Sequence, residues 1–249
     1  MKRGKGRPDA QAPGDQGLSD LSEDAADFGR VELRTVRHML VRPAKVLAAY
    51  MDGGPTGHGV YSRPLRLYLT LCGFMMLVLF FTGGTTATLE QLERLQVSGI
   101  DIDDLAQQAG KTREAFLSDG NDWITLLIVP VGTLLYVPFI APLLRWWDPA
   151  NLGWRRSFRA TLTYLNAWTI PLLPLSWMAW DRDYAGVSAI ALTGLGIIAF
   201  MRTGRGRWFR TTAGGLTKCV ALVLVTQLAG LVAFPILAGV GLLGGLYGN

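Results

Sequence analysis

Residues 33–84 decide the fold of this chain. They read LRTVRHMLVRPAKVLAAYM (33–51), DGGPTGHGVYSRP (52–64) and LRLYLTLCGFMMLVLFFTGG (65–84). The first part is basic and amphipathic, the second is a glycine-rich turn, and the third is an apolar run of about twenty residues. That is the length an α-helix needs to cross ~30 Å of hydrocarbon. We therefore predict a surface helix, a turn and a first membrane span.

Apolar blocks of similar length recur along the rest of the chain. The 249 residues are 50% hydrophobic and only 17% charged, which is more apolar than an ordinary soluble domain. The blocks lack the period-two alternation of an outer-membrane barrel. The predicted fold class is an all-α integral membrane bundle whose five transmembrane helices cover residues 64–84, 123–144, 158–180, 184–201 and 216–243.

Charge predicts how the bundle is oriented. Five spans with a cytoplasmic N-terminus and an outer C-terminus place 20 of the 24 Lys and Arg residues on the cytoplasmic side. Cytoplasmic loops of membrane proteins are enriched in these residues, so this orientation satisfies the positive-inside rule. The predicted location is a bacterial inner membrane. The same rule accounts for the net charge of +5, so we do not expect a nucleic-acid partner.

Three regions follow from this pattern. Residues 1–29 have a basic start followed by acids, Gly, Pro and Ser, and are predicted to be a disordered cytoplasmic tail. Residues 30–62 hold the amphipathic helix and its glycine-rich hinge, and residues 63–249 hold the spans. Within them, the polar segment 85–122 carries eight acids and three bases, and is predicted to be an extracytoplasmic loop with two short amphipathic helices around Ser98 and Gly99.

The amphipathic helix is the first candidate site. Its apolar side would lie in the acyl boundary while its cations contact anionic headgroups, and Pro43 would kink it or split it in two. A helix packed on a cytoplasmic loop is the alternative. The candidate anionic-lipid contacts are Arg34, Arg37, Arg42, Lys45, Arg63 and Arg66.

Prolines and polar residues within the spans are the second candidate site. Prolines in membrane helices free carbonyl groups that neighbouring helices can satisfy, so the second and third spans are expected to be kinked and to form the packing core. Asn166 is expected to make an interhelical hydrogen bond. The candidate kink and polar positions are Pro130, Pro138, Pro142, Tyr164, Asn166, Pro171, Pro174 and Gln227.

Catalytic and metal-binding patterns are absent from the sequence. No Asp, Glu, Lys, Arg or His lies in the middle of a predicted span, which argues against proton relays, ion-coupled transport and intramembrane catalysis. Cys72 and Cys219 stand outside any CxxC or Cys/His arrangement and are expected to be buried as small apolar residues. We predict no catalytic residue, no metal site and no cofactor.

One part of the chain resembles a known family. The motif P-x-K-V-L-x-x-Y (Pro43 to Tyr50), a glycine-containing hinge and Y-S-R-P (Tyr61 to Pro64) resemble a bacterial multi-pass membrane family of unknown function. The five-span layout is also similar to the YIP-type membrane proteins. Many members of the bacterial family begin with a cysteine-based zinc-ribbon-like segment, whereas this chain has no cysteine before Cys72. The resemblance implies no known enzymatic activity.

These observations predict a non-enzymatic inner-membrane protein that organises lipid or a partner. Its partners would be anionic headgroups and either another membrane protein or further copies of the chain. The alternative is a permease or lipid-translocating subunit with proline-broken spans around a polar path formed by Tyr164, Asn166 and Gln227.

Overall fold

The computed structural model describes residues 29–81, 89, 101–150, 152–179 and 184–248, and these form helices joined by turns and loops, without a strand. Residues 1–28 of the predicted tail and the Ser98–Gly99 break lie outside them, whereas Gly29, the last residue of that tail, is helical. A first helical segment covers residues 29–41. The following elements are α2 (Pro43–Asp52), η1 (Gly54–Thr56), α3 (Pro64–Phe81), α5 (Ile102–Gln108), α6 (Arg113–Trp147), α7 (Trp154–Leu172), η2 (Leu173–Leu175), α8 (Ser176–Ala179), α9 (Ala185–Gly204) and α10 (Thr212–Tyr247).

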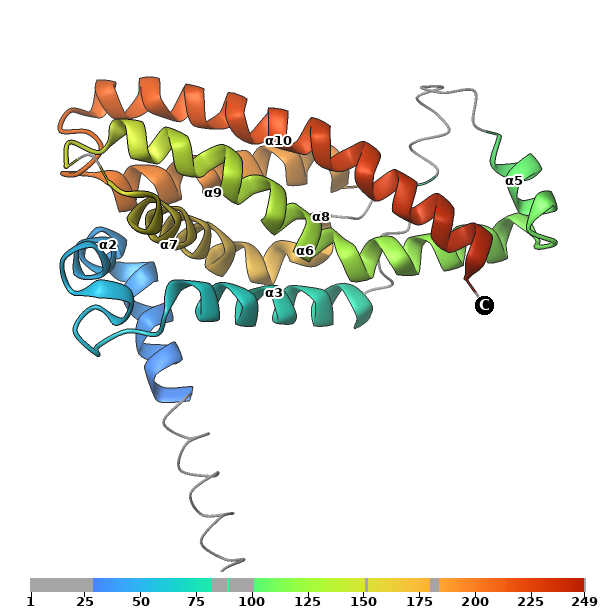
Figure 1. Ribbon diagram of the computed structural model, residues 1–249, viewed down its shortest axis with the longest axis horizontal. Coiled ribbons are helices and arrows are strands. Elements are labelled where there is room, and N and C mark those ends of the chain that lie inside the picture. The colour runs from blue at the N-terminus through green and yellow to red at the C-terminus, as the bar shows by residue number, and fades with distance from the viewer. Residues whose placement is uncertain (1–28, 82–88, 90–100, 151, 180–183, 249) are drawn as a thin grey trace, which may run out of the picture.

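Four helices are long and apolar enough to cross a membrane: α3, α6, α9 from Gly186 onward, and α10. They run along the long axis of the molecule (Figure 1) and correspond to four of the five predicted spans. Large apolar side chains cover their outer faces; Ile190 is 77% exposed and Leu231 is 71% exposed. Such a surface is typical of a protein that lies in lipid.

The remaining predicted span, 158–180, corresponds to α7, η2 and α8. It is not among the four apolar helices, because α7 carries three arginines in its first turns, Arg155, Arg156 and Arg159. It also carries polar side chains on its buried face, among them Thr161, Thr163 and Asn166. Two of these hydroxyls are satisfied within the helix: Thr161 donates to the Ser157 carbonyl at 3.0 Å and Thr163 to the Arg159 carbonyl at 2.7 Å. Since α7 packs against α2, α3, α6 and α9, it is the central helix of the bundle.

The prolines act differently in the two helices where they cluster. In the third predicted span, Pro171 lies in the last turn of α7 and Pro174 lies in η2, so the α-helix is interrupted there. α6 instead continues through its three prolines, Pro130, Pro138 and Pro142, and all three are exposed. α6 packs against α7, as expected, and also against α10. Its prolines are nevertheless exposed and do not face the neighbouring helices.

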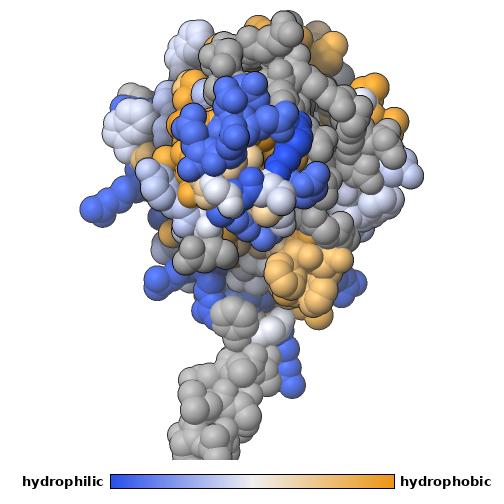
Figure 2. Space-filling view, turned by 90° about the vertical axis from the view of Figure 1, so that its right-hand side faces the viewer, coloured by the Kyte–Doolittle hydropathy of each residue, from blue (hydrophilic) through white to orange (hydrophobic). Residues whose placement is uncertain are grey.

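The two ends of the bundle carry opposite charge. At one end, called the acidic end, α5 begins with Asp101 as its N-cap and α6 begins at Arg113, ten residues before the predicted span. The Thr112 hydroxyl caps α6 by accepting from the Ala115 amide at 3.3 Å. Figure 2 looks at this end and shows hydrophilic side chains gathered over it. The other end, called the basic end, holds α2, the first turns of α3, α7 and α10, and the last turns of α6 and α9.

Close packing of α10 on α6 holds the acidic end together. Gly241 and Gly244 of α10 lie against Ile124 and Trp123 of α6, and a Cβ built at either glycine would come within 2.5 Å of those side chains. Lys111 joins the helices further by donating to the Gly245 carbonyl at 3.0 Å and to the Gly248 carbonyl. A cation near the last carbonyls of α10 also interacts favourably with the dipole of that helix.

Candidate functional site

The amphipathic segment is divided at Pro43 and docks on the basic end. Residues 29–41 form one helix and α2 forms the next. α2 buries Val46, Leu47 and Tyr50 against α7 and α9. The segment therefore packs against the bundle along one of its faces.

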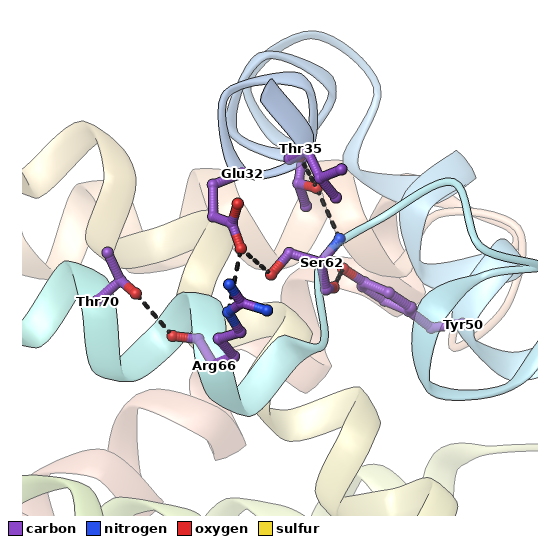
Figure 3. Close-up of polar contacts among 7 residues, drawn as sticks. Glu32, Thr35, Tyr50, Ser62, Arg66 and Thr70 are labelled. Carbon is purple, nitrogen blue, oxygen red and sulfur yellow. Dashed lines mark hydrogen bonds and ion pairs between the residues drawn. The ribbon is translucent and has the colours of Figure 1, made fainter. Parts of the chain in front are cut away.

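A buried polar cluster fixes the first helix to the start of α3 (Figure 3). Glu32 is 8% exposed; its carboxylate accepts from the Ser62 hydroxyl at 2.9 Å and forms an ion pair with Arg66 Nε at 3.3 Å. The Thr35 hydroxyl accepts from the Ser62 amide at 3.0 Å. Sequence reasoning missed Glu32 and Ser62, because their positions 30 residues apart give no sign that they meet.

Tyr50 connects this cluster to α7. Its hydroxyl donates to the Ser62 carbonyl at 2.5 Å, and its own carbonyl accepts from Arg159 at 2.8 Å. Burial, and then the neighbouring Tyr61 and Glu32, raise the pKa of Tyr50 above its usual value. The phenol therefore stays protonated and continues to donate throughout the physiological pH range.

The predicted lipid contacts divide into two groups. Arg66 is held by Glu32, whereas five others, Arg34, Arg37, Arg42, Lys45 and Arg63, are exposed and form no ion pair with any residue that the structure describes. Leu33 and Leu40 are 71% and 43% exposed. Because they are seven residues apart, they share one side of the helix. Exposed cations beside an exposed apolar edge fit a membrane surface.

A cavity of about 460 Å³ lies inside the bundle, lined by residues of α3, α6, α7, α9 and α10. Its lining includes the exposed residues Ala189 and Gln227, so the cavity reaches the outer surface between α9 and α10. Among its lining residues in the described part of the chain there is no Asp, Glu, Lys, Arg or His. Its volume is in the range of small-molecule sites.

The cavity contains few polar groups, and several of these are already bonded. The Tyr164 hydroxyl donates to the Gly196 carbonyl at 3.4 Å and Trp168 Nε1 donates to the Leu192 carbonyl at 3.0 Å. Both cysteines are buried, form no disulfide and line the cavity. Within the described residues, no group of three or more His, Cys, Asp or Glu side chains could hold a metal ion. The lining favours an apolar ligand.

The predicted polar path is only partly assembled. Tyr164 and Gln227 line the cavity, but Asn166 does not; its side-chain amide donates to the Pro64 carbonyl at 2.9 Å. Asn166 therefore makes the interhelical bond that the sequence predicts, joining α7 to the first residue of α3. Its role is to position α3.

A second cavity, of about 450 Å³, lies at the basic end between α2, residues 148–150 and residues 203–207. In its wall, Asp148 forms a buried ion pair with Arg207, with Nε to Oδ2 at 2.5 Å and Nη2 to Oδ1 at 3.2 Å. Asp148 also accepts from the Ala150 amide at 3.0 Å. The pair joins the end of α6 to the turn after α9.

These features define the class of protein: a helical bundle of membrane type with an internal apolar cavity and a basic end. Comparison of the chain with family models, curated proteins and solved structures found no match in any of the three. The resemblance to the bacterial family and to the YIP-type layout stays a prediction.

Proposed function

We propose that this chain is a non-enzymatic, five-span inner-membrane protein that binds a membrane lipid. One acyl chain would occupy the central cavity, and the basic end would face the cytoplasm and contact anionic headgroups. The observation that carries the proposal is the apolar cavity that reaches the outer surface between α9 and α10. A ligand from the bilayer could enter there without crossing water.

The fifth crossing is supported by the course of the chain. α6 ends at the basic end, where Asp148 follows it, and α9 ends there too, because Arg207 pairs with Asp148. Two successive long helices that end on the same side require a connection that returns to the opposite side. α7, η2 and α8 provide this connection. The arginines in the first turns of α7, together with its inward-facing polar groups, explain why its sequence is less apolar.

The cavity begins close enough to the basic end to take the chain of a lipid whose headgroup lies there. Tyr68 and Cys219 line the cavity four and seven residues after the first residues of α3 and α10. At a rise of 1.5 Å per residue, the cavity begins roughly 6–10 Å inside that end. Arg63 lies at the start of α3, level with a headgroup whose chain extends into the cavity.

Filling the cavity tests this proposal. Gly230 lines it, and the nearest atom to an added Cβ there is the Tyr136 hydroxyl at 3.8 Å, so Gly230→Leu would extend into free space. We expect native mass spectrometry of the full chain, titrated with phosphatidylcholine, to show one bound lipid whose affinity falls about tenfold in this variant. Gly239→Leu on the same helix is the matched control, because no atom lies within 4 Å of its added Cβ. Equal binding of lipid by both variants would contradict binding of the lipid in the central cavity.

The basic helix is tested separately. A cation near an anionic membrane surface contributes about 1 kcal/mol, so Arg34→Gln with Arg37→Gln should weaken retention of phosphatidylglycerol about tenfold or more. Retention of neutral phosphatidylcholine should be unchanged, and raising the salt concentration should reduce the difference between variant and wild type. Undiminished phosphatidylglycerol retention at low salt would show that these residues do not contact lipid.

The permease alternative gains no support from the position of Asn166, which is committed to the Pro64 carbonyl. If Asn166→Leu left transport unchanged, Asn166 would be excluded from a transport path, and only Tyr164 and Gln227 would remain as its polar groups.

A further inference from the structure

The second cavity, at the basic end, has a chemistry different from that of the central one. One wall is formed by the apolar and small residues Ala44, Leu47 and Ala48 of α2. The rest of the lining includes Arg205 and Arg207, which flank Gly206, together with Asp148 and Thr203. Two guanidinium groups and one carboxylate line the cavity, so it has an excess of one positive charge.

The ion pair leaves some N–H groups of the two arginines without an acceptor. The Asp148 carboxylate accepts hydrogen bonds from Nε and Nη2 of Arg207. Nη1 of Arg207 forms no hydrogen bond with the described residues. Arg205 is exposed and its guanidinium has no partner within the same part of the chain. Asp148 thus fixes Arg207 in the wall, while both arginines keep N–H groups available for an anion. Planar guanidinium groups match phosphate oxygens in geometry and charge.

Thr203 supplies an independent observation. It is 0% exposed, lines the cavity, and its hydroxyl has no hydrogen-bond partner among the described residues. A buried hydroxyl without a partner is unfavourable, and a threonine in a helix ordinarily bonds to a carbonyl of the preceding turn. Among the described residues that line this cavity, Thr203 is the one whose buried polar atom has no partner.

We propose that this cavity binds a phosphate group, through Arg205, Nη1 of Arg207 and the Thr203 hydroxyl, with the uncharged part of the ligand against the apolar wall of α2. The phosphate belongs either to a lipid headgroup or to a soluble phosphate. This site is separate from the central cavity, and its test does not involve the variants used there.

The test measures ligand-dependent thermal unfolding of the full chain in a neutral detergent. The probes are dihexanoyl phosphatidic acid, with dihexanoyl phosphatidylcholine for comparison, and inorganic phosphate, with chloride at equal ionic strength. We expect phosphatidic acid to raise the unfolding midpoint. Arg205→Gln should weaken the apparent affinity about tenfold, Thr203→Val about threefold, and the control Arg210→Gln less than twofold; Arg210 is exposed and does not line the cavity.

Each outcome decides something about the site. A response to inorganic phosphate that Arg205→Gln also weakens supports a site for soluble phosphate, and a response to phosphatidic acid alone supports a headgroup site. If neither probe shifts the midpoint, or if Arg210→Gln weakens binding as much as Arg205→Gln, the proposal is overturned. If Thr203→Val raises the midpoint without ligand and leaves the affinity unchanged, the hydroxyl is not a ligand.

Discussion

Asp148→Ala is expected to lower the free energy of unfolding by about 3 kcal/mol, because it leaves a partly buried guanidinium without its counter-charge. The Asp148 side chain is 0% exposed and the Arg207 side chain is 23% exposed, so water can replace the lost carboxylate only in part. The substitution also removes the acceptor for the Ala150 amide. The change should appear as a lower midpoint in detergent denaturation of the full chain.

A double variant separates the charge effect from a general loss of packing. Asp148→Ala with Arg207→Met removes both charges, and replacing both members of a buried pair is often close to neutral. We expect the double variant to recover more than half of the lost stability. Asp104→Ala, at the exposed N-terminal turn of α5, serves as the control for removing an acid. Equal destabilisation by the single and double variants would contradict a role for the ion pair.

Gly245→Val is expected to cost about 3 kcal/mol, the upper part of the range for overpacking a close contact. A Cβ at this position would come within 2.7 Å of the Phe116 ring, which is fully buried in the core of the acidic end. The ring belongs to a cluster of buried side chains that includes Ile102 and Ile124, both also 0% exposed, so it has little room to shift. Separation of α10 from α6 would also weaken the bond from Lys111 to the Gly245 carbonyl.

Hydrogen exchange can place this effect in the structure. In Gly245→Val, amides in the last turns of α10 and the first turns of α6 should exchange faster, while those of α2 and the first turns of α3 should be unchanged. Gly239→Val is the control, because it adds the same side chain to the same helix with no atom within 4 Å of its Cβ. A similar loss of stability in both variants would attribute the effect to valine in the helix and not to the α6–α10 contact.

The helical elements could largely be predicted from the sequence. Apolar runs of span length correspond to α3, α6, α9 and α10 because each such run must bury its backbone polar groups in its own hydrogen bonds. The division at Pro43 was also predictable, because proline has no backbone N–H to donate and its ring restricts the backbone conformation of the preceding residue. α6 begins ten residues before the predicted span, because the Thr112 cap extends the helix through a polar segment that hydropathy assigns to a loop.

The sequence indicated which types of residue would form the sites, but not how those residues come together. Tyr164 and Gln227 were suspected as polar positions, but their place in one cavity depends on the relative rotation of five helices. The pairing of Asp148 with Arg207, 59 residues apart, and that of Glu32 with Ser62 depend on how the loops at the basic end return to one another.

The sequence by itself determined that the chain forms long apolar helices, that basic residues collect at one end of them, and that residues 30–62 make a divided amphipathic segment. These properties follow from local composition and periodicity, which act within a few turns of one helix. Only the tertiary structure decided that the polar helix α7 lies at the centre, that Asn166 holds α3, and that two cavities of different chemistry form. Packing decides these features, because they arise where side chains from distant parts of the chain meet or leave space.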